Sequence, residues 1–159
     1  MSAENRTILA RAVEAYNSGN LSDYFQLYDE SVVLHGYGPQ PIDLAGATAF
    51  YTGLKNAFPD GVLSIDVQIE EGDKIACVYS MRGTHKGEFA DIAPTEKSVH
   101  LTGQTMFRFS DGKVVERWNT ADVLGLLVQL GAVTPPSCSL ARRGAGSLDA
   151  RLSHCRAAI

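Results

Sequence analysis

The stretch TMFRFSDGKVVERWNTADVLGLLVQLG, from Thr105 to Gly131, decides the fold. Two runs of alternating apolar and polar residues flank the dipeptide Asp111-Gly112, which is a strong signal for a two-residue hairpin turn. An apolar helical run follows without a loop, starting after Asp122 and stopping at Gly131. Because Asp is a preferred N-cap and Gly a common stop, the sequence predicts a hairpin that leads directly into a short helix.

Outward from this stretch, the predicted helices come first in the chain and most of the predicted strands come last. Helical spacing of apolar residues predicts helices at 8–16, 21–30 and 45–58, with Ser22 as the N-cap of the second. Predicted strands lie at 31–38, 62–71, 75–85, 98–109 and 114–121. This order predicts an α+β fold, in which a curved antiparallel or mixed sheet wraps around the N-terminal helices as a cone with a pocket.

The composition is that of a globular protein with room for a ligand cavity. The chain has 159 residues, of which 45% are hydrophobic and 20% charged, and its net charge is −4. A negative net charge gives no basic field for nucleic acid, and no apolar run approaches the roughly 18 residues of a membrane span. The N-terminal residues lack the apolar stretch of a signal peptide. We therefore expect a cytoplasmic protein without a nucleic-acid or membrane partner.

Composition divides the chain into two parts. Residues 1–133 form the predicted cone domain, and residues 134–159 form a tail with four arginines and one aspartate. We expect this basic tail to be loosely ordered, with Ser147 as the cap of a short helix. No metal-ligand spacing is present, so we expect no metal site. That judgement covers Cys77, Cys138, Cys155, His35, His85 and His100.

Strand alternation predicts which side chains face the pocket. If Asp111-Gly112 form the turn, counting along both strands places the more apolar set toward the helices. This inward set is Leu101, Thr105, Phe107, Phe109, Val114, Trp118 and Asp122. In the preceding strand the inward set is Ile75, Cys77, Tyr79, Met81 and His85. The outward set includes His100, Met106, Arg108 and Arg117, and a bulge would invert these assignments.

Asp122 and two histidines are the candidate catalytic residues, and each also has a structural interpretation. Asp122 caps the helix, whereas on an apolar inner face burial would raise its pKa toward the range useful for acid–base chemistry. The helix N-terminus favours the carboxylate and acts in the opposite direction. His35 precedes a Gly-rich turn and His85 lies between glycines. Either is a structural histidine, or a group that polarises a carbonyl or moves a proton.

Six short motifs occur in order along the chain. They are AFPD (57–60), EEGDKIACVY (70–79), GTHKGEF (83–89), IAPTEKSV (92–99), RFSDGKVVERWNTAD (108–122) and LLVQLG (126–131). As a set they resemble the SnoaL-like polyketide (ester) cyclase family, over about residues 5–131. The resemblance implies a nuclear-transport-factor-2-like cone, also called a cystatin-like α+β barrel, with a deep apolar pocket and no metal or organic cofactor. Glu96, where the family pattern has Gly, and Val78, where many relatives have Arg, depart from that pattern.

The resemblance also implies a reaction, the intramolecular aldol condensation that closes the last ring of an aromatic polyketide. Asp122 matches the acid/base residue of that scheme, and His35 and His85 match pocket histidines. Tyr16 matches a position that often lines the pocket. With the strand alternation, this makes Tyr16, Tyr79, Trp118, Thr105 and Phe107 the expected substrate-binding residues.

Three functions remain open from the sequence. In the first, Asp122 removes a C–H proton from a small, apolar, poly-oxygenated substrate, and His85 or His35 hydrogen-bonds the developing enolate. In the second, the chain is another proton-transfer enzyme, a ketosteroid-isomerase-like isomerase or a hydratase, with His35 as the base. In the third, it is a non-catalytic ligand-binding or dimer-forming domain.

We also expect a symmetric homodimer through the outward face of the final hairpin, where Met106 and Arg117 lie.

Overall fold

A computed structural model describes residues 2–134 of the chain. Nine elements occur in this part: α1 (Ser2–Asn17), α2 (Leu21–Phe25), β1 (Tyr28–His35), α3 (Leu44–Ala57), β2 (Val62–Glu71), β3 (Lys74–Thr84), β4 (Ser98–Ser110), β5 (Lys113–Ala121) and α4 (Val123–Leu130). The predicted basic tail, apart from Thr134, lies outside the described residues, as does the helix expected after Ser147. None of the described helices is long and apolar enough to span a membrane.

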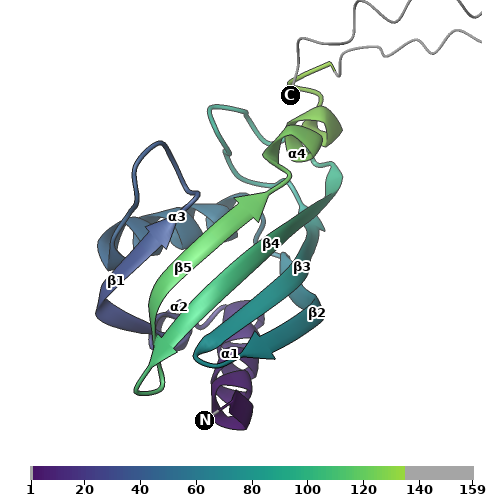
Figure 1. The fold of residues 1–159 in the computed structure, drawn as a ribbon. Helices are drawn as coiled ribbons and strands as arrows, with labels where there is room; N and C mark the ends of the chain where they lie inside the picture. Colours follow the sequence, from purple (N-terminus) through teal and green to yellow (C-terminus); the bar gives the residue numbers. More distant parts are fainter. Residues whose placement is uncertain (1, 135–159) are drawn as a thin grey trace, which may run out of the picture.

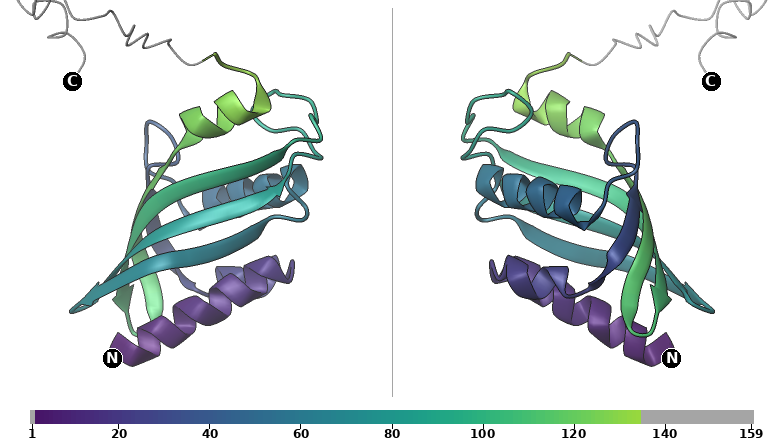
Figure 2. Two further views of the ribbon diagram at one scale, coloured as in Figure 1. Left: turned by 90° about the vertical axis from the view of Figure 1, so that its right-hand side faces the viewer. Right: turned by 90° about the vertical axis from the view of Figure 1, so that its left-hand side faces the viewer.

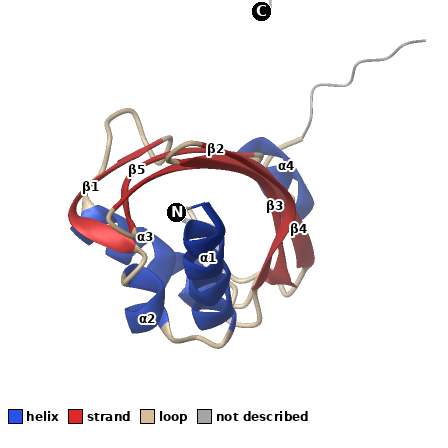
Figure 3. Ribbon diagram, turned by 60° about the horizontal axis from the view of Figure 1, so that its bottom comes forward, coloured by secondary structure: helices blue, strands red, loops and turns tan. Residues whose placement is uncertain are grey.

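The five strands form a single curved sheet in the order β1-β5-β4-β3-β2 (Figure 1). β1 runs parallel to β5, and the other neighbours are antiparallel. The sheet is unclosed and bends around α1, with α2 and α3 also on its concave side (Figures 2 and 3). This mixed sheet, curved over helices, confirms the predicted α+β cone.

The core lies between the concave face and the helices. α1 buries Leu9, Ala12 and Tyr16, which recur at helical spacing. On the sheet side, Leu101 and Phe107 of β4 are also buried, as the alternation predicts. Each such large apolar side chain contributes about 1.5–3 kcal/mol by leaving water, so the packing of the helices holds the sheet in its curved shape.

The predicted turn and the helix after it are both present. Ser110 pairs with Lys113 across a two-residue loop, and Asp111 and Gly112 have φ angles of 50° and 76°, as a type I′ turn requires. α4 ends at Gly131, which has a left-handed φ of 84°. The hairpin and its direct continuation into a helix are confirmed.

β5 carries a bulge that strand alternation alone did not place. Phe109 pairs with Val114, whereas Arg108 pairs with Glu116. Val115 is therefore an extra residue on β5, without a counterpart on β4. A bulge of this kind shifts the alternation of every later side chain on its strand by one position.

The predicted orientations on β5 are wrong as a result. Arg117, expected to face outward, is buried in the core with 6% of its surface exposed. Trp118, expected to face the pocket, pairs with Met106 on the outer face. Asp122 is exposed rather than partly desolvated. On β3, where no such shift affects the inward set, Tyr79 and its inward neighbours are buried as predicted.

The second predicted helix is shorter than expected. α2 ends at Phe25, and Tyr28 already belongs to β1, where it pairs with Val114. The N-cap is Asn20, not Ser22, because the Asn20 side chain accepts a hydrogen bond from the backbone N–H of Asp23 at 3.2 Å. Pairing with β5 thus overrides the local helical pattern.

Gly36, which follows β1, allows β1 and β5 to approach each other closely. It has a φ of 86°, and a Cβ atom there would lie 1.8 Å from the backbone oxygen of Asn119. We expect Gly36→Ala to lower the free energy of unfolding by at least about 1 kcal/mol, because left-handed strain and the clash act together. Urea unfolding measures the change.

Gly38 provides the matched control, since a Cβ atom there would meet nothing within 4 Å. Gly38→Ala should change the free energy of unfolding by less than about 0.5 kcal/mol. Equal unfolding midpoints for the two variants would contradict the close approach of Gly36 to β5.

Candidate active site

An enclosed cavity of about 250 Å³ lies between the helices and the concave face of the sheet. Its lining is mostly apolar, with polar atoms from tyrosines, Arg117 and Asn119. The exposed side chains of Phe50 (40%) and Val123 (47%) mark its mouth, between α3 and α4. Tyr16 and Arg117 are 1% and 6% exposed, and both contact Tyr51; we call this buried, polar part of the lining the floor of the cavity. An enclosed, largely apolar cavity with a few convergent polar groups is the usual form of a small-molecule site.

The Arg117 guanidinium is held by hydroxyl groups from four elements. Its Nη1 donates to the Tyr28 and Tyr51 hydroxyls at 2.6 Å each, and to the Tyr24 hydroxyl at 3.3 Å. Its Nε donates to Thr105 Oγ1 at 2.9 Å. The guanidinium thereby joins α2, β1, α3 and β4 to β5 from inside the core.

The charge of Arg117 is neutralised by none of these partners. Within residues 2–134, no carboxylate forms an ion pair with the guanidinium. Burial disfavours its charge, but the surrounding tyrosine hydroxyls raise the pKa of Arg117 well above the ordinary value. The guanidinium also lies over the ring of Phe107, 4.7 Å from its centroid, a cation–π contact. The floor of the cavity therefore carries a buried positive charge.

Tyr16 adds a hydrogen-bond donor to the same floor. Its hydroxyl is buried without a hydrogen-bond partner, and burial raises the pKa of Tyr16 to about 12. The group is therefore a neutral O–H donor near pH 7. Its ring packs edge-on against Tyr24 and Tyr51, both of which contact Arg117. A buried donor without an acceptor costs about 1–3 kcal/mol, which a ligand that supplies the acceptor would recover.

Asp122 stands at the rim of the cavity rather than inside it. Its side chain caps α4 by accepting a hydrogen bond from the Gly125 N–H at 2.8 Å, and the residue is exposed. It does not line the cavity, but its chain neighbours Ala121 and Val123 do. The structural interpretation of Asp122 as a cap is confirmed, and its catalytic role stays a prediction.

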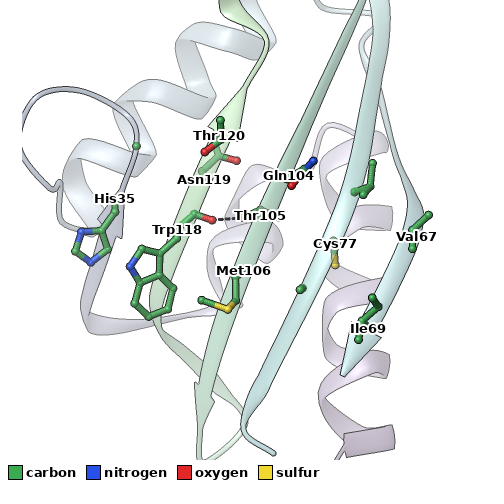
Figure 4. Close-up of a pocket in the computed structure, with 13 residues that line it drawn as sticks. His35, Val67, Ile69, Cys77, Gln104, Thr105, Met106, Trp118, Asn119 and Thr120 are labelled. Atoms are coloured by element: carbon green, nitrogen blue, oxygen red, sulfur yellow. Dashed lines mark hydrogen bonds between the residues drawn. The ribbon is translucent and has the colours of Figure 1, made fainter. Parts of the chain in front are cut away.

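His35 lies on the opposite side of the sheet from the enclosed cavity. Its Nε2 is 3.0 Å from Glu116 Oε1, and its ring stacks on Trp118 with a centroid distance of 5.4 Å. Hydrogen bonds from Arg108 and then from His35 lower the pKa of Glu116. His35 and Trp118 line an open groove of about 530 Å³ on the convex face (Figure 4).

His85 is buried on the inner side, as strand alternation predicts, but it does not line the enclosed cavity. Its Nδ1 accepts a hydrogen bond from the backbone N–H of Thr95 at 3.2 Å and lies 3.0 Å from the Thr95 hydroxyl. Its ring packs against Phe58. These contacts hold the connection between β3 and β4 against the end of β3 and against Phe58. The same connection contains Phe89, which lines the enclosed cavity. The catalytic role of His85 stays a prediction.

The structure does not bring the three predicted catalytic residues together. Of the predicted substrate-binding residues, Tyr16 and Tyr79 line the enclosed cavity, and the Tyr79 hydroxyl donates to Asn119 Oδ1 at 3.0 Å. Thr105 and Phe107 line a small adjoining hollow below Arg117, and Trp118 lines the outer groove. In the described residues, no group of three or more His, Cys, Asp or Glu side chains could hold a metal ion.

Arg117 and four aromatic lining residues were not predicted from the sequence: Tyr37, Phe50, Tyr51 and Phe89. One signal was available, since five of the six tyrosines lie within the first 51 residues. Tyrosines concentrated on elements that pack under one sheet indicate a shared polar cluster, because buried hydroxyls need partners. Nothing in the sequence indicated that Arg117 faces the core, because its orientation depends on the bulge in β5.

The tyrosine cluster should be visible in a spectrophotometric titration. All six tyrosines have a pKa above the ordinary value of 10.0, mainly because of burial. We expect no tyrosinate absorbance near pH 10 until the protein unfolds. Because the folded pKa values are raised, stability is fully present below pH 10 and falls as the pH rises above it. A normal titration of the folded protein near pH 10 would contradict the buried cluster.

The fold is similar to those of several solved structures. Among solved structures, AclR of Streptomyces galilaeus, a proposed hydroxylase, is similar with a TM-score of 0.79 and 30% identity, covering 84% of this chain and 100% of its own. IdmH of Streptomyces antibioticus, a proposed polyketide cyclase, has a TM-score of 0.70 and 30% identity over 80% of this chain and 98% of its own.

A third structure, a proposed SnoaL-like polyketide cyclase from Jannaschia sp. CCS1, has a TM-score of 0.75 and 20% identity over 84% of this chain and 96% of its own. That identity supports the fold alone. No curated protein gives a match. The sequence profile of the SnoaL-like polyketide cyclases matches residues 6–130, which is most of the chain. The chain therefore belongs to the SnoaL-like polyketide cyclase family.

Proposed function

We propose that the chain catalyses a cofactor-independent acid–base reaction, the intramolecular aldol ring closure of a small polyketide-type substrate. The observation that carries this proposal is the enclosed apolar cavity with Arg117 and Tyr16 on its floor. Fixed donors in a water-poor site stabilise an oxygen on which negative charge develops. The similarity to IdmH supports the cyclase reaction, whereas the similarity to AclR leaves room for a different one.

In this proposal the base and the donors lie at opposite ends of the cavity. Asp122 at the rim removes an acidic C–H proton and later returns it to the aldol oxygen. Arg117 and Tyr16 on the floor hold the enolate oxygen, a role that the sequence analysis gave to His85 or His35. A conjugated, poly-oxygenated substrate can carry the negative charge from a carbon near Asp122 to an oxygen at the floor. Such a substrate is its own electron sink, so the reaction needs no cofactor.

The size of the cavity restricts the part of the substrate that it encloses. At about 250 Å³, it is below the roughly 300–1,000 Å³ of sites for drug-sized ligands. We expect about two fused rings to fit inside, and a larger substrate to extend through the mouth between Phe50 and Val123. The enclosed rings would then be the ones whose charge the floor stabilises.

Proton abstraction can be tested without the natural substrate. We expect the protein to accelerate deuterium exchange at the benzylic CH₂ beside the carbonyl of 2-tetralone, a two-ring ketone, followed by NMR. Asp122→Asn keeps the size of the side chain and its capping oxygen but removes the base. Exchange should therefore fall by about 100-fold or more while the fold is retained.

Asp43→Asn is the matched control, because Asp43 caps α3 in the same way, accepting a hydrogen bond from the Gly46 N–H at 2.9 Å. This control should keep the full exchange rate. Unchanged exchange in Asp122→Asn would exclude Asp122 as the base. Binding of 2-tetralone without any acceleration of exchange would favour a non-catalytic binding domain, which is consistent with the exposed position of Asp122.

We also propose that two copies pair through the convex face of the sheet. The outer groove is lined by Trp118, Met106 and three exposed apolar side chains of β2 and β3, namely Val67, Val78 and Ile69 (Figure 4). Contiguous exposed apolar surface commonly marks an interface. Because Arg117 is buried, it takes no part in this patch, which centres on Trp118 and Met106 instead.

Two valines on β2 give a matched test of this pairing. Val67 and Val62 are each 51% exposed, but only Val67 lines the groove. Light scattering should give twice the chain mass of 17.1 kDa for the wild type and for Val62→Glu, and the single-chain mass for Val67→Glu. A wild-type mass of one chain, or a dimer that survives Val67→Glu, would remove this interface.

A further inference from the structure

We infer that Arg117 and Tyr16 form a site for a preformed oxyanion, so that the ligand enters the cavity as an anion with its charged oxygen directed to the floor. The inference deepens the proposed function by naming the substrate class, and it rests on that proposal only in taking the enclosed cavity as the ligand site. The ligand class is a flat, apolar body that carries a carboxylate, or a phenolate or enolate oxygen.

The floor of the cavity carries a positive charge. Arg117 lies 94% buried beside a mostly apolar cavity, and its hydrogen-bond partners in the described chain are neutral hydroxyls. A buried charge is costly unless an opposite charge and hydrogen bonds compensate it. An anion in the cavity would interact with the guanidinium far more strongly than in water, because the surroundings have a low dielectric constant.

The tyrosine hydroxyls around Arg117 have more hydrogens than the described residues have acceptors for them. Tyr24 and Tyr28 share one hydrogen bond at 3.1 Å, and Tyr37 and Tyr51 share another at 2.7 Å. Each pair has two hydroxyl hydrogens and uses one of them, so one hydrogen in each pair lacks an acceptor among residues 2–134. The Tyr16 hydroxyl has no partner either. Of these tyrosines, Tyr16, Tyr37 and Tyr51 line the cavity, so its lining has more hydroxyl donors than acceptors, which is the complement of an oxyanion with several lone pairs.

Polar and apolar side chains line different parts of the cavity. The donors gather at the buried floor, while the remaining wall is built from side chains such as Leu54, Met81 and Leu101. A ligand with one charged oxygen and an apolar body fits this arrangement in a single orientation. A cationic ligand is disfavoured by Arg117, and a neutral carbonyl uses fewer of the available donors.

Calorimetry with two isosteric probes tests the charge preference directly. The carboxylate of 2-naphthoate and the neutral amide of 2-naphthamide have the same shape and the same two-ring body. We expect the wild-type protein to bind 2-naphthoate at least about tenfold more tightly, as for a hydrogen bond to a charged group.

A third probe, 4-nitro-1-naphthol, distinguishes a phenolate or enolate ligand from a carboxylate. Its phenolate is coloured, so absorbance reports the ionisation of the bound molecule. Binding beside Arg117 should lower the pKa of the bound naphthol below its value in buffer. Anion preference in the naphthoate arm alone assigns the site to carboxylates, and a lowered pKa in the naphthol arm alone assigns it to phenolates or enolates.

Substitutions locate the effect on the floor of the cavity. Arg117→Met should abolish the preference for 2-naphthoate over 2-naphthamide, and Tyr16→Phe should reduce it several-fold. Arg108→Met is the matched control. It removes the same charge as Arg117→Met, but from β4, where Arg108 pairs with Glu116 on the outer face of the sheet. It should leave the preference unchanged. If Arg117→Met does not fold, Tyr16→Phe and the wild-type comparison still decide the question.

Equal affinity for 2-naphthoate and 2-naphthamide, together with an unshifted pKa of the bound naphthol, would overturn the inference. A preference that persists in Arg117→Met and Tyr16→Phe would also overturn it, because the anion would then bind elsewhere. Neither result bears on the comparison of Asp122→Asn with Asp43→Asn in the deuterium-exchange experiment, because that comparison tests the base and not the floor. Failure of the oxyanion site and failure of the proposed catalysis can therefore be told apart.

Discussion

The hydrogen bonds of the Arg117 guanidinium hold the inner side of this cone together. Through Tyr24, Tyr28, Tyr51 and Thr105 they connect two helices and two strands to β5, and all of these contacts are made in the core. A buried guanidinium is costly to desolvate, so the surrounding side chains must supply interactions that offset this cost. The tyrosine hydroxyls accept its hydrogen bonds, and the ring of Phe107 makes a cation–π contact with it. Both kinds of contact stabilise the charge that lies at the floor of the cavity.

One extra residue on β5 determines whether this interaction exists. The Asp111-Gly112 turn and the inward side chains of β3 and β4 were predicted correctly from the sequence. These follow from turn chemistry and from alternation, which are local properties. The bulge at Val115 lies in β5, which pairs with β1 and β4, and no single residue in the sequence signals it. The side-chain orientations predicted beyond Val115 were therefore inverted. Arg117 faces the core, where Trp118 was expected, and Trp118 faces outward, where Arg117 was expected.

The candidate site was predicted in part, for a related reason. Tyr16 and Tyr79 line the enclosed cavity, because helix periodicity and the regular β3 pattern place them there. Asp122 was correctly predicted as the cap of α4. Its position at the rim of the cavity, away from Arg117 and Tyr16, follows from the end of β5 at Ala121. His35 and His85 were chosen by residue type and by family resemblance. The partner of His35, Glu116, comes from a distant part of the chain, and the partner of His85, Thr95, comes from the irregular connection between β3 and β4, so neither contact could be predicted from local periodicity.

An experimentally determined structure of the protein with 2-naphthoate bound would test the central claim most directly, since that claim concerns where the charged oxygen lies. The account predicts the two rings in the enclosed cavity, with the carboxylate within hydrogen-bond distance of the Arg117 guanidinium and the Tyr16 hydroxyl. A probe bound in the outer groove beside Trp118, or a β5 strand with Arg117 facing solvent, would contradict it.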